Sequence, residues 1–599
     1  GAIALDYRGK SGLATALGHA PAAGLINAAN GSILSIAEAL TNIIWAPMPN
    51  KMRSVSLSAN WMWPCKNAGE DARIYEGVEA ASNFACALGI NIPTGKDSCS
   101  MTQKYKDDVV YSPGTVIISA SGEVSDVKKI VEPVLVKDKA LYYIDFSKAP
   151  KELGGSAFAQ IVNKLGTATP TVSDAAYFVK AFNVMQELIE NEFIASGHDI
   201  GGGGLITSLL EMCFANNESG LDVDLTTLNE TDTIKTLFAE NPGIIFQADE
   251  KAEKLLNDNN ISFLKIGKPA QAGKVSVRNG QEIHEFDIPS LRDLWFKTSY
   301  LLDRKQSGEK LALERYKNYK KNELNYQFGS FDGKLASLNI DLKHRTKGKV
   351  KAAIIREKGV NGDREMAYSM YLAGMEVKDV HMTDLISGRE DLSELNMIVF
   401  VGGFSNSDVL GSAKGWAGAF KYNEKARVAL ENFYKRDDTL SLGVCNGCQL
   451  MVELGLIETP DAVAPKMLHN ESHKFESIFL NVNILPNKSV MLGNMTGKTL
   501  GIWVAHGEGK FSLPSGENKY NIALKYANTG YPGNPNGSDF NTAGICSPDG
   551  RHLAMMPHLE RAIFPWQWGY YPEDRKTDEV SPWIEAFVNA KNWIENKLK

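Results

Sequence analysis

The chain has 599 residues, with 64 Lys and Arg against 71 Asp and Glu and a formal net charge of −7. One hydrophobic core rarely serves more than about 300 residues, so we expect about three or four domains. The mild negative charge argues against a general nucleic-acid binder, and no apolar run reaches the roughly 20 residues of a membrane span. The seven cysteines are sparse and odd in number, so they predict no disulfide framework and favour a reducing cytoplasm.

The first residues predict a strand, Ala2–Leu5, and no Met precedes them. We expect the C-terminal part of a longer polypeptide; the alternative is a trimmed tag before a genuine start. Strand and helix patterns then divide the sequence into four blocks. Residues 1–134 and 135–290 are each expected to form an α+β domain. Residues 291–347, rich in Lys, Glu, Tyr and Asn, predict a surface linker, and 348–599 predict an α/β domain with a parallel sheet. Further strands are expected at residues 54–59, 114–119, 140–145 and 350–355.

A cysteine lies where a predicted buried strand, Thr439–Val444, meets a predicted helix. A residue at such an elbow projects from the edge of the sheet, and Gly443 and Gly447 on either side allow a tight turn. The N-terminal end of the helix favours a thiolate, and its free N–H groups, Asn446 first, suit an oxyanion. We therefore predict that Cys445 is a nucleophile that attacks a carbonyl group.

Other interpretations of Cys445 stay open. A cysteine is often only a small buried hydrophobe, and Cys445-Asn-Gly-Cys448 is also a CxxC pattern of redox or zinc sites. No second CxxC or paired His cluster completes a zinc site, and Cys448 is expected to face the core. A candidate general base supports the interpretation of Cys445 as a nucleophile. His558 and Glu560 follow the apolar run Leu553–Met556, and alternate positions of an extended segment share a face. Glu560 can then orient His558 as in a catalytic triad.

At this point the sequence resembles known families. Gly443–Gln449 with Pro557–Arg561 is similar to class I glutamine amidotransferases. Gly402–Gly411, Ala505–Lys510 and Asn534–Ser538 narrow the resemblance to the large single-chain type of the phosphoribosylformylglycinamidine synthase family. The first block matches that family, in order, at residues 5–9, 38–43, 58–61, 69–72 and 95–101.

The resemblance implies a multidomain α+β and α/β protein. Two α+β domains like those of aminoimidazole ribonucleotide synthetase, a linker and a flavodoxin-like α/β glutamine amidotransferase domain are expected. The implied reaction is the glutamine-hydrolysing, ATP-dependent conversion of formylglycinamide ribonucleotide to formylglycinamidine ribonucleotide in cytoplasmic purine biosynthesis. Family chains are roughly twice as long by the domain-size argument. The expected partner is therefore the N-terminal half of the same polypeptide, with the catalytic substrate pocket.

The same resemblance assigns roles to residues of the last block. Its catalytic groups would be Cys445, His558 and Glu560. Glutamine and its oxyanion would be held by Gly403, Asn446 and Gln449.

A polar stripe on a helix of the first block suits a metal ion. Glu38 and Asn42 are four residues apart on one face, and Mg²⁺ prefers such oxygen donors alongside nucleotide phosphates. The alternative is an ordinary solvated helix face. The resemblance favours Mg²⁺ with Glu38, Asn42 and Asp199 as ligands, plus one acidic ligand upstream of Gly1. It also implies ATP or ADP bound at Gly95, Lys96, Asp97 and Gly201, where Gly201 belongs to a glycine-rich turn before a helix.

The sequence departs from the family pattern in three places. Gly201 and Gly202 replace the usual Ser and Asp, which puts side-chain contacts to phosphate there in doubt. Leu559 stands where Pro is usual between the His and the Glu, and Asn406-Ser407 replaces Tyr-Gly. None of these changes removes a catalytic group.

Two other functions stay open. The last block suits a flavodoxin-like cysteine hydrolase or deglycase that does not select glutamine. The first two blocks suit a structural or auxiliary scaffold whose nucleotide never turns over.

Overall fold

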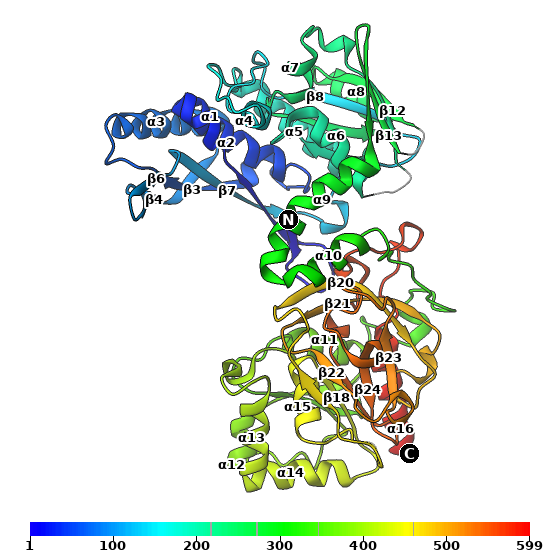
Figure 1. Ribbon diagram of the computed structural model, residues 1–599. Coiled ribbons are helices and arrows are strands. Elements are labelled where there is room, and N and C mark those ends of the chain that lie inside the picture. The colour runs from blue at the N-terminus through cyan, green and yellow to red at the C-terminus, as the bar shows by residue number, and fades with distance from the viewer. Residues whose placement is uncertain (216–218, 271–272, 346, 459) are drawn as a thin grey trace. The chain divides into compact units, whose positions relative to one another are not determined.

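The structure is a computed structural model that divides into two compact units, Gly1–Trp295 and Phe296–Lys599 (Figure 1). Residue 346 of the predicted linker, and a few residues of the domains on either side, lie outside the described residues. None of the described helices is long and apolar enough to cross a bilayer. The described residues are 1–215, 219–270, 273–345, 347–458 and 460–599.

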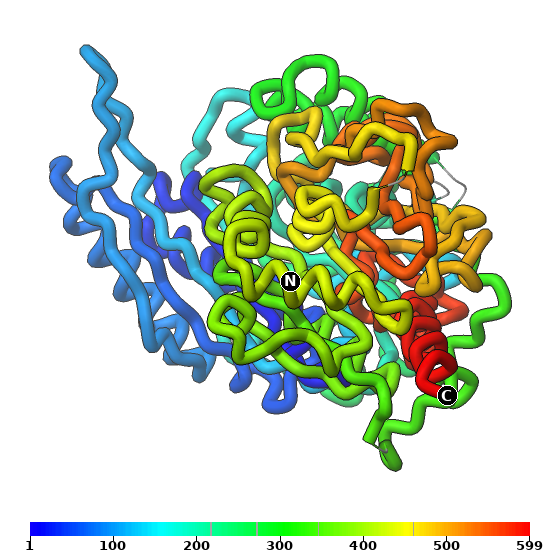
Figure 2. The backbone as a smooth tube through the Cα atoms, turned by 90° about the horizontal axis from the view of Figure 1, so that it is seen from below, coloured from blue at the N-terminus to red at the C-terminus, as the bar shows by residue number. Residues whose placement is uncertain are grey.

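The first unit begins with a five-stranded sheet in the order β1-β2-β7-β3-β4, in which only β3 and β4 pair in parallel. Helix α2 packs on β2 and β7 because its apolar positions, including Ile36 and Leu40, face the sheet and are fully buried. The light blue β5–β6 hairpin extends beyond this sheet in Figure 2. The elements are β1 (Ala2–Ala4), β2 (Gly12–Gly18), α1 (Pro21–Ile26), α2 (Ala28–Ile43), β3 (Val55–Met62), α3 (Glu70–Leu88), β4 (Asn91–Ser98), β5 (Thr102–Tyr105), β6 (Asp108–Tyr111) and β7 (Thr115–Val124).

A seven-stranded sheet follows in the same unit, in the order β14-β13-β10-β12-β8-β11-β9. Phe178 and Phe182 of α5 join one of its faces to the core beneath α2, and Leu209 of α6 is buried in a second core. The elements are β8 (Ala140–Asp145), α4 (Ala157–Ile161), α5 (Ala175–Glu190), β9 (Ile194–Asp199), α6 (Gly204–Phe214), β10 (Leu221–Asp224), α7 (Thr233–Phe238), β11 (Gly243–Ala248), α8 (Glu250–Asp258), β12 (Leu264–Pro269), β13 (Lys274–Asn279) and β14 (Glu282–Asp287).

The predicted linker contains two helices, α9 (Ile288–Gln306) and α10 (Gly308–Asn318), which the sequence did not indicate. Helix α10 has no continuous apolar stripe. Ion pairs and aromatic contacts attach it to the rest of the second unit. Arg315 Nη2 lies 2.9 Å from Glu476 Oε2, and its Nη1 lies 3.4 Å from Asp303 Oδ2. The guanidinium also covers the ring of Tyr531 at 4.6 Å. Charged helices of this kind lack the apolar periodicity that predicts a helix from sequence.

The second unit is built on a nine-stranded sheet in the order β16-β15-β17-β18-β25-β24-β23-β20-β21. Strands β16 to β25 in that order are parallel, and the remaining four continue it antiparallel, an extension that the prediction of a parallel sheet did not include. The strands are β15 (Lys351–Arg356), β16 (Glu376–His381), β17 (Met397–Phe400), β18 (Leu440–Val444), β19 (Lys466–Leu468), β20 (Glu476–Ile484), β21 (Thr499–His506), β22 (Lys510–Ser512), β23 (Ile522–Tyr526), β24 (Thr542–Cys546) and β25 (His552–Met555). The helices are α11 (Asp363–Leu372), α12 (Met382–Ser387), α13 (Lys414–Tyr422), α14 (Glu424–Lys435), α15 (Asn446–Glu453) and α16 (Ile584–Lys597).

The predicted fold class, two α+β domains followed by an α/β domain, is confirmed. Strands form where β-branched runs predicted them, at β3, β7, β8, β15 and β18. The strands beside the predicted nucleophile are fully buried: every residue of β18 and of β25 is buried. Central strands of a parallel sheet are covered on both faces, which explains their continuous apolar sequence.

Candidate active site

Cys445 lies at the turn between β18 and α15. Its backbone has φ 52° and ψ −107°, a conformation that residues with a side chain rarely adopt. The flanking glycines permit this turn. A Cβ at Gly447 would lie 1.9 Å from the carbonyl oxygen of Phe400, and one at Gly443 would lie 2.5 Å from that of Gly447. The strand and the helix therefore meet only because both side chains are absent.

His558 and Glu560 lie just beyond β25, the strand beside β18. His558 Nδ1 is 2.6 Å from Glu560 Oε1, and both side chains are almost fully buried. Burial alone would lower the pKa of His558, but the carboxylate of Glu560, followed by the neighbouring Cys445, raises it to about 9. The pKa of Glu560 is lowered, since the attraction of His558 outweighs its burial. The imidazolium–carboxylate form is therefore favoured near neutral pH.

His558 and Cys445 meet at Gly402, which follows β17. A Cβ at Gly402 would lie 2.7 Å from His558 Cε1 and 3.3 Å from the Cβ of Cys445. Nε2 of His558 is buried and has no hydrogen-bond partner among the described residues. The arrangement thus leaves one imidazole nitrogen for proton transfer beside the thiol, while Glu560 fixes the other.

A second histidine, His506, is the last residue of β21, next to a residue that contacts the nucleophile. Cys445 Sγ lies 3.5 Å from the carbonyl oxygen of Ala505, the neighbour of His506. Burial, followed by the charge of His558, lowers the pKa of His506 to about 3, so this ring is neutral. Asn536 Nδ2 lies 3.1 Å from its Nε2. The two histidines therefore differ in charge, and His558 is the one equipped to carry a proton.

The side chains of Asn446 and Gln449 connect loops around the thiol. Asn446 Oδ1 accepts a hydrogen bond from Ser405 N at 3.2 Å, and its Nδ2 donates to Gln449 Oε1 at 3.0 Å. Gln449 Nε2 in turn donates to the carbonyl oxygen of Glu508 at 2.8 Å. Both amides are thus engaged within the protein. The backbone N–H of Asn446, the first residue of α15, has no acceptor within its own helix.

Gly403, the predicted oxyanion glycine, follows Gly402, which packs against Cys445, and has φ 130°. A Cβ there would lie 2.5 Å from the Cα of Val360, so only glycine fits. Asn361 N donates to the carbonyl oxygen of Gly402 at 2.8 Å and fixes this approach. Hydrogen bonds at Gly402 and Ser405 therefore hold this segment next to Cys445 and Asn446.

The predicted metal residues line a cavity in the first unit. Glu38, Asn42, Asp199 and Gly201 all contribute to its wall. A Cβ at Gly201 would lie 3.6 Å from Glu38 Oε1 and 3.9 Å from Asp199 Oδ2, so the two carboxylates converge there. The pKa of each is raised, first by burial; for Glu38, the charges of Asp199 and Glu240 add to the shift.

Asn42 Nδ2 lies 3.5 Å from the carbonyl oxygen of Leu17, which leaves the Asn42 carbonyl oxygen for a ligand. No three His, Cys, Asp or Glu side chains among the described residues form a metal-binding group by themselves. The predicted nucleotide residues Gly95, Lys96 and Asp97 lie apart from this cavity, on the exposed edge strand β4.

Comparison with known proteins agrees with this architecture. Residues 349–594 match a CobB/CobQ-like glutamine amidotransferase domain, residues 1–123 an FGAR-AT PurM_N-like domain, and residues 141–278 the C-terminal domain of AIR synthase related proteins. The chain is 39% identical, over 99% of its length and 46% of the relative's, to phosphoribosylformylglycinamidine synthase of Homo sapiens. A probable chloroplastic/mitochondrial synthase of Arabidopsis thaliana is 38% identical over 99% of this chain and 44% of its own.

The chain is homologous to the phosphoribosylformylglycinamidine synthases. It spans about half the length of the curated relatives it matches. The resemblance to this family that the sequence motifs indicated is confirmed.

Within this homologue of the synthases, two residues near the site, Asp408 and Glu508, lie in the quoted motifs but were given no role from the sequence. The carboxyl group of Asp408 has a pKa raised by burial and by the charge of Glu508, and one of its oxygens is buried without a partner among the described residues. Glu508 Oε2 accepts a hydrogen bond from Ser412 N at 3.3 Å. Asp408 follows Asn406 and Ser407, the two positions where the sequence departs from the synthase pattern. That departure is the sequence feature that could have indicated a role for Asp408.

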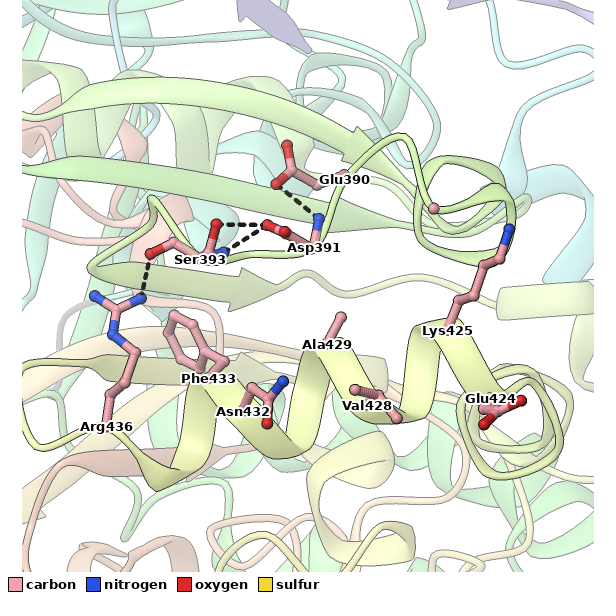
Figure 3. A pocket seen from close by; sticks show the side chains of 11 residues that line it. Glu390, Asp391, Ser393, Glu424, Lys425, Val428, Ala429, Asn432, Phe433 and Arg436 are labelled. Atoms are coloured by element: carbon pink, nitrogen blue, oxygen red, sulfur yellow. Dashed lines mark hydrogen bonds between the residues drawn. The ribbon is translucent and has the colours of Figure 1, made fainter.

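The surface pocket of Figure 3 lies away from all these groups. Its walls are α14 and the segment around Asp391 and Ser393. Arg436, at one end, donates to the carbonyl oxygen of Ser393 at 2.7 Å and pairs with Asp438, so its guanidinium is already engaged. None of the residues predicted for the synthase reaction lines this pocket.

Proposed function

We propose that the second unit is the glutaminase of a phosphoribosylformylglycinamidine synthase. The observation that carries the proposal is a buried thiol, Cys445, on a strained elbow beside a His558–Glu560 pair whose free Nε2 faces it. This is the arrangement of a nucleophile, a general base and an orienting acid. A redox role is poorly supported, because Cys448 is completely buried and its pKa is raised by that burial.

In the proposed reaction, the Cys445 thiolate attacks the carboxamide carbon of glutamine. Backbone N–H groups at Gly403 and Asn446 stabilise the oxyanion. His558 gives a proton to the departing nitrogen, which leaves as ammonia, and the acyl group stays on sulfur as a thioester. His558 then takes a proton from water, whose oxygen attacks the thioester to release glutamate. Asn446 and Gln449 act here by fixing the loops that surround glutamine.

For the first unit we propose a Mg²⁺–nucleotide site at Glu38, Asn42 and Asp199. Mg²⁺ is commonly held by one or two carboxylates together with phosphate oxygens, so two carboxylates and an amide oxygen fit it. Burial raises the pKa of both carboxyl groups, and the charge of Asp199 adds to the shift of Glu38, so a bound cation would stabilise their charged forms. The turn at Gly201 precedes the N-terminus of α6, which suits phosphate. Bound Mg²⁺ would neutralise phosphate charge.

The complete activity proposed for the longer protein is the ATP-dependent conversion of formylglycinamide ribonucleotide to the amidine. Ammonia in neutral water is mostly protonated and non-nucleophilic, so it must reach the ligase site through a shielded passage. Glutamine, ATP and the ribonucleotide are the proposed substrates, and an N-terminal half like that of the relatives is the proposed partner.

The test is glutamine hydrolysis by the purified chain carrying Cys445→Ala, with Cys448→Ala as the matched control. Loss of the nucleophile should reduce turnover by several powers of ten, while Cys448→Ala should retain activity. A glutamine analogue with an electrophilic carbon should label Cys445 in the unmodified chain. Failure to label it, with hydrolysis of other esters or amides intact, would indicate a cysteine hydrolase of different specificity.

A further inference from the structure

Two cysteines lie side by side at the ends of neighbouring strands in the first unit. The parallel pairing of β3 and β4 continues beyond their last residues: Trp63 N donates to Ser98 O at 2.9 Å, and Cys65 N donates to Cys99 O at 3.1 Å. Backbones paired in this way lie about 5 Å apart. A disulfide joins Cα atoms about 4.4–6.8 Å apart, so the main chain already has a suitable spacing.

The side chains also approach each other. The Cys65 side chain lies close enough to Cys99 to raise the pKa of its thiol, and Cys99 Sγ lies 3.4 Å from Asp97 Oδ2. Cys99 is exposed and Cys65 is partly exposed, so both can be reached by a small solute. Cys86 on α3 is exposed as well, whereas the other four cysteines are buried.

We propose that Cys65 and Cys99 form a reversible disulfide, a redox modification site separate from the glutaminase. Exposed disulfides of this kind are typically the labile ones, formed and reduced as conditions change. The bond would tie the segment that leads from β3 into α3 to the end of β4. This inference stands on the geometry of the first unit and does not depend on the proposed glutaminase.

Hydrogen peroxide is a suitable oxidant, and the step balances. The Cys65 thiolate attacks one peroxide oxygen, the O–O bond breaks, and hydroxide leaves and is protonated to water. Cys99 sulfur then attacks the Cys65 sulfenic acid, the S–O bond breaks, and a second water leaves with the Cys99 proton. Two thiols are oxidised by two electrons, and one peroxide is reduced to two waters. A small dithiol reverses the reaction by exchange.

The surroundings indicate which sulfur reacts first. The neighbouring Cys65 and the carboxylate of Asp97, to which the Cys99 thiol donates, raise the pKa of Cys99 to about 11, which disfavours its thiolate. Cys65 is therefore the attacking thiol, and Cys99 resolves the sulfenic acid. Replacing Asp97 by Asn should speed disulfide formation, because it removes a negative charge beside Cys99.

The experiment treats the reduced, folded chain with hydrogen peroxide, blocks free thiols with N-ethylmaleimide and maps the unreduced peptides by mass spectrometry. We expect a peptide pair joined through Cys65 and Cys99, loss of two alkylation sites, and recovery of both after dithiothreitol. Cys65→Ser and Cys99→Ser should each abolish the cross-link, while Cys86→Ser leaves it unchanged. In Cys99→Ser, dimedone should trap a sulfenic acid on Cys65.

Several results would overturn the proposal. One is the absence of the cross-link in chain whose Cys65 and Cys99 both alkylate readily before oxidation. Another is separate over-oxidation of the two sulfurs, or a cross-link through Cys86. Trapping by dimedone on Cys99 instead of Cys65 would reverse the assigned order and contradict the role given to Asp97.

Discussion

The 2.6 Å contact between His558 and Glu560 determines how His558 can act. With Nδ1 held by the carboxylate, only Nε2 can exchange a proton with a substrate or with Cys445. Asp and Glu partners of this kind fix the tautomer of the ring and stabilise its charged form. The protonation state of His558 in this pair can also be measured independently of catalysis.

We expect Glu560→Gln to lower glutaminase turnover on the order of 10²–10⁴-fold, as loss of the acid does in comparable triads. The substitution should also lower the pKa of His558, now about 9, because its counter-charge is gone. A pH–rate profile and the titration of His558 by NMR would measure both effects. Unchanged titration of His558 would contradict the assigned ion pair.

The same pair makes stability depend on pH. The pKa of His558 is raised from 6.5 to about 9 in the folded chain, so its contribution is complete below pH 6.5 and is lost as pH rises through 9. The pKa of Glu560 is lowered from 4.5, so its contribution is complete above that pH and is lost on acidification. We expect the Tm of Glu560→Gln to fall furthest below that of the native chain between pH 5 and pH 6.5, roughly. The difference should shrink above pH 9.

How far single residues could be predicted depends on the distance between partners in the sequence. Cys445 is recognisable because its strand, its glycines and its helix are contiguous, and His558 lies two positions from Glu560. His506 and Asn536 lie 30 residues apart and meet only through the sheet. Short-range sequence patterns cannot predict such contacts, because they form only when the strands of the sheet come together.

At the scale of elements, the junction of β18 and α15 depends on the absence of side chains. At Gly447 a Cβ would meet the backbone of Phe400, which cannot move aside as a flexible side chain can. We expect Gly447→Ala to destabilise the second unit by about 1–3 kcal/mol or more, as overpacking does, and to displace Cys445. Chemical denaturation and a glutaminase assay would show it. Gly493→Ala is the control, because a Cβ there meets nothing within 4 Å.

Ion pairs of Arg315 attach helix α10 to the second unit. Replacing Arg315 should therefore lower the free energy of unfolding of that unit. Glu476 is 4% exposed and loses its cation in Arg315→Ala, whereas Asp303, 9% exposed, keeps Lys474 at 2.8 Å. We expect a loss of about 2–3 kcal/mol, below the usual cost for a fully buried pair because Arg315 is itself 34% exposed.

Arg427→Ala provides the comparison for α10. Arg427 pairs with Glu431 at i,i+4, and both side chains are 46% exposed, so its removal should cost about 0.3–0.5 kcal/mol at most. Equal effects of the two substitutions on the denaturation midpoint would show that the Arg315 contacts do not anchor α10.

At the scale of the whole molecule, the two units carry separate proposed chemistry. The sequence allowed the α+β and α/β domains to be predicted, because runs of strand-forming residues and their alternation with helical patterns can be recognised locally. It did not reveal α9 and α10, whose charged faces lack apolar periodicity. It also could not reveal that Gly95 to Asp97 lie away from the Glu38 cavity, because that depends on the order of strands in the sheet.

We expect Glu38→Ala and Asn42→Ala to weaken binding of ADP with Mg²⁺ by at least about tenfold, in the range seen when the surroundings of a bound metal are altered. Glutamine hydrolysis by the same variants should be unchanged, because Cys445 and its partners all lie in the second unit. Calorimetric titration and a glutaminase assay give the two readouts. Glu79→Ala, an exposed carboxylate on α3, is the matched control. Unaltered affinity in both variants would return Glu38 and Asn42 to an ordinary polar helix face.

The backbone of Cys445 has a consequence for how this protein responds to selection. A residue with a side chain held at φ 52° and ψ −107° costs about 1–3 kcal/mol relative to a relaxed conformation. Glycine at this position would relieve that cost and remove the nucleophile in a single substitution. A laboratory screen that rewards heat resistance alone would therefore enrich inactive chains, and selection for robustness in this molecule has to be coupled to turnover at every round.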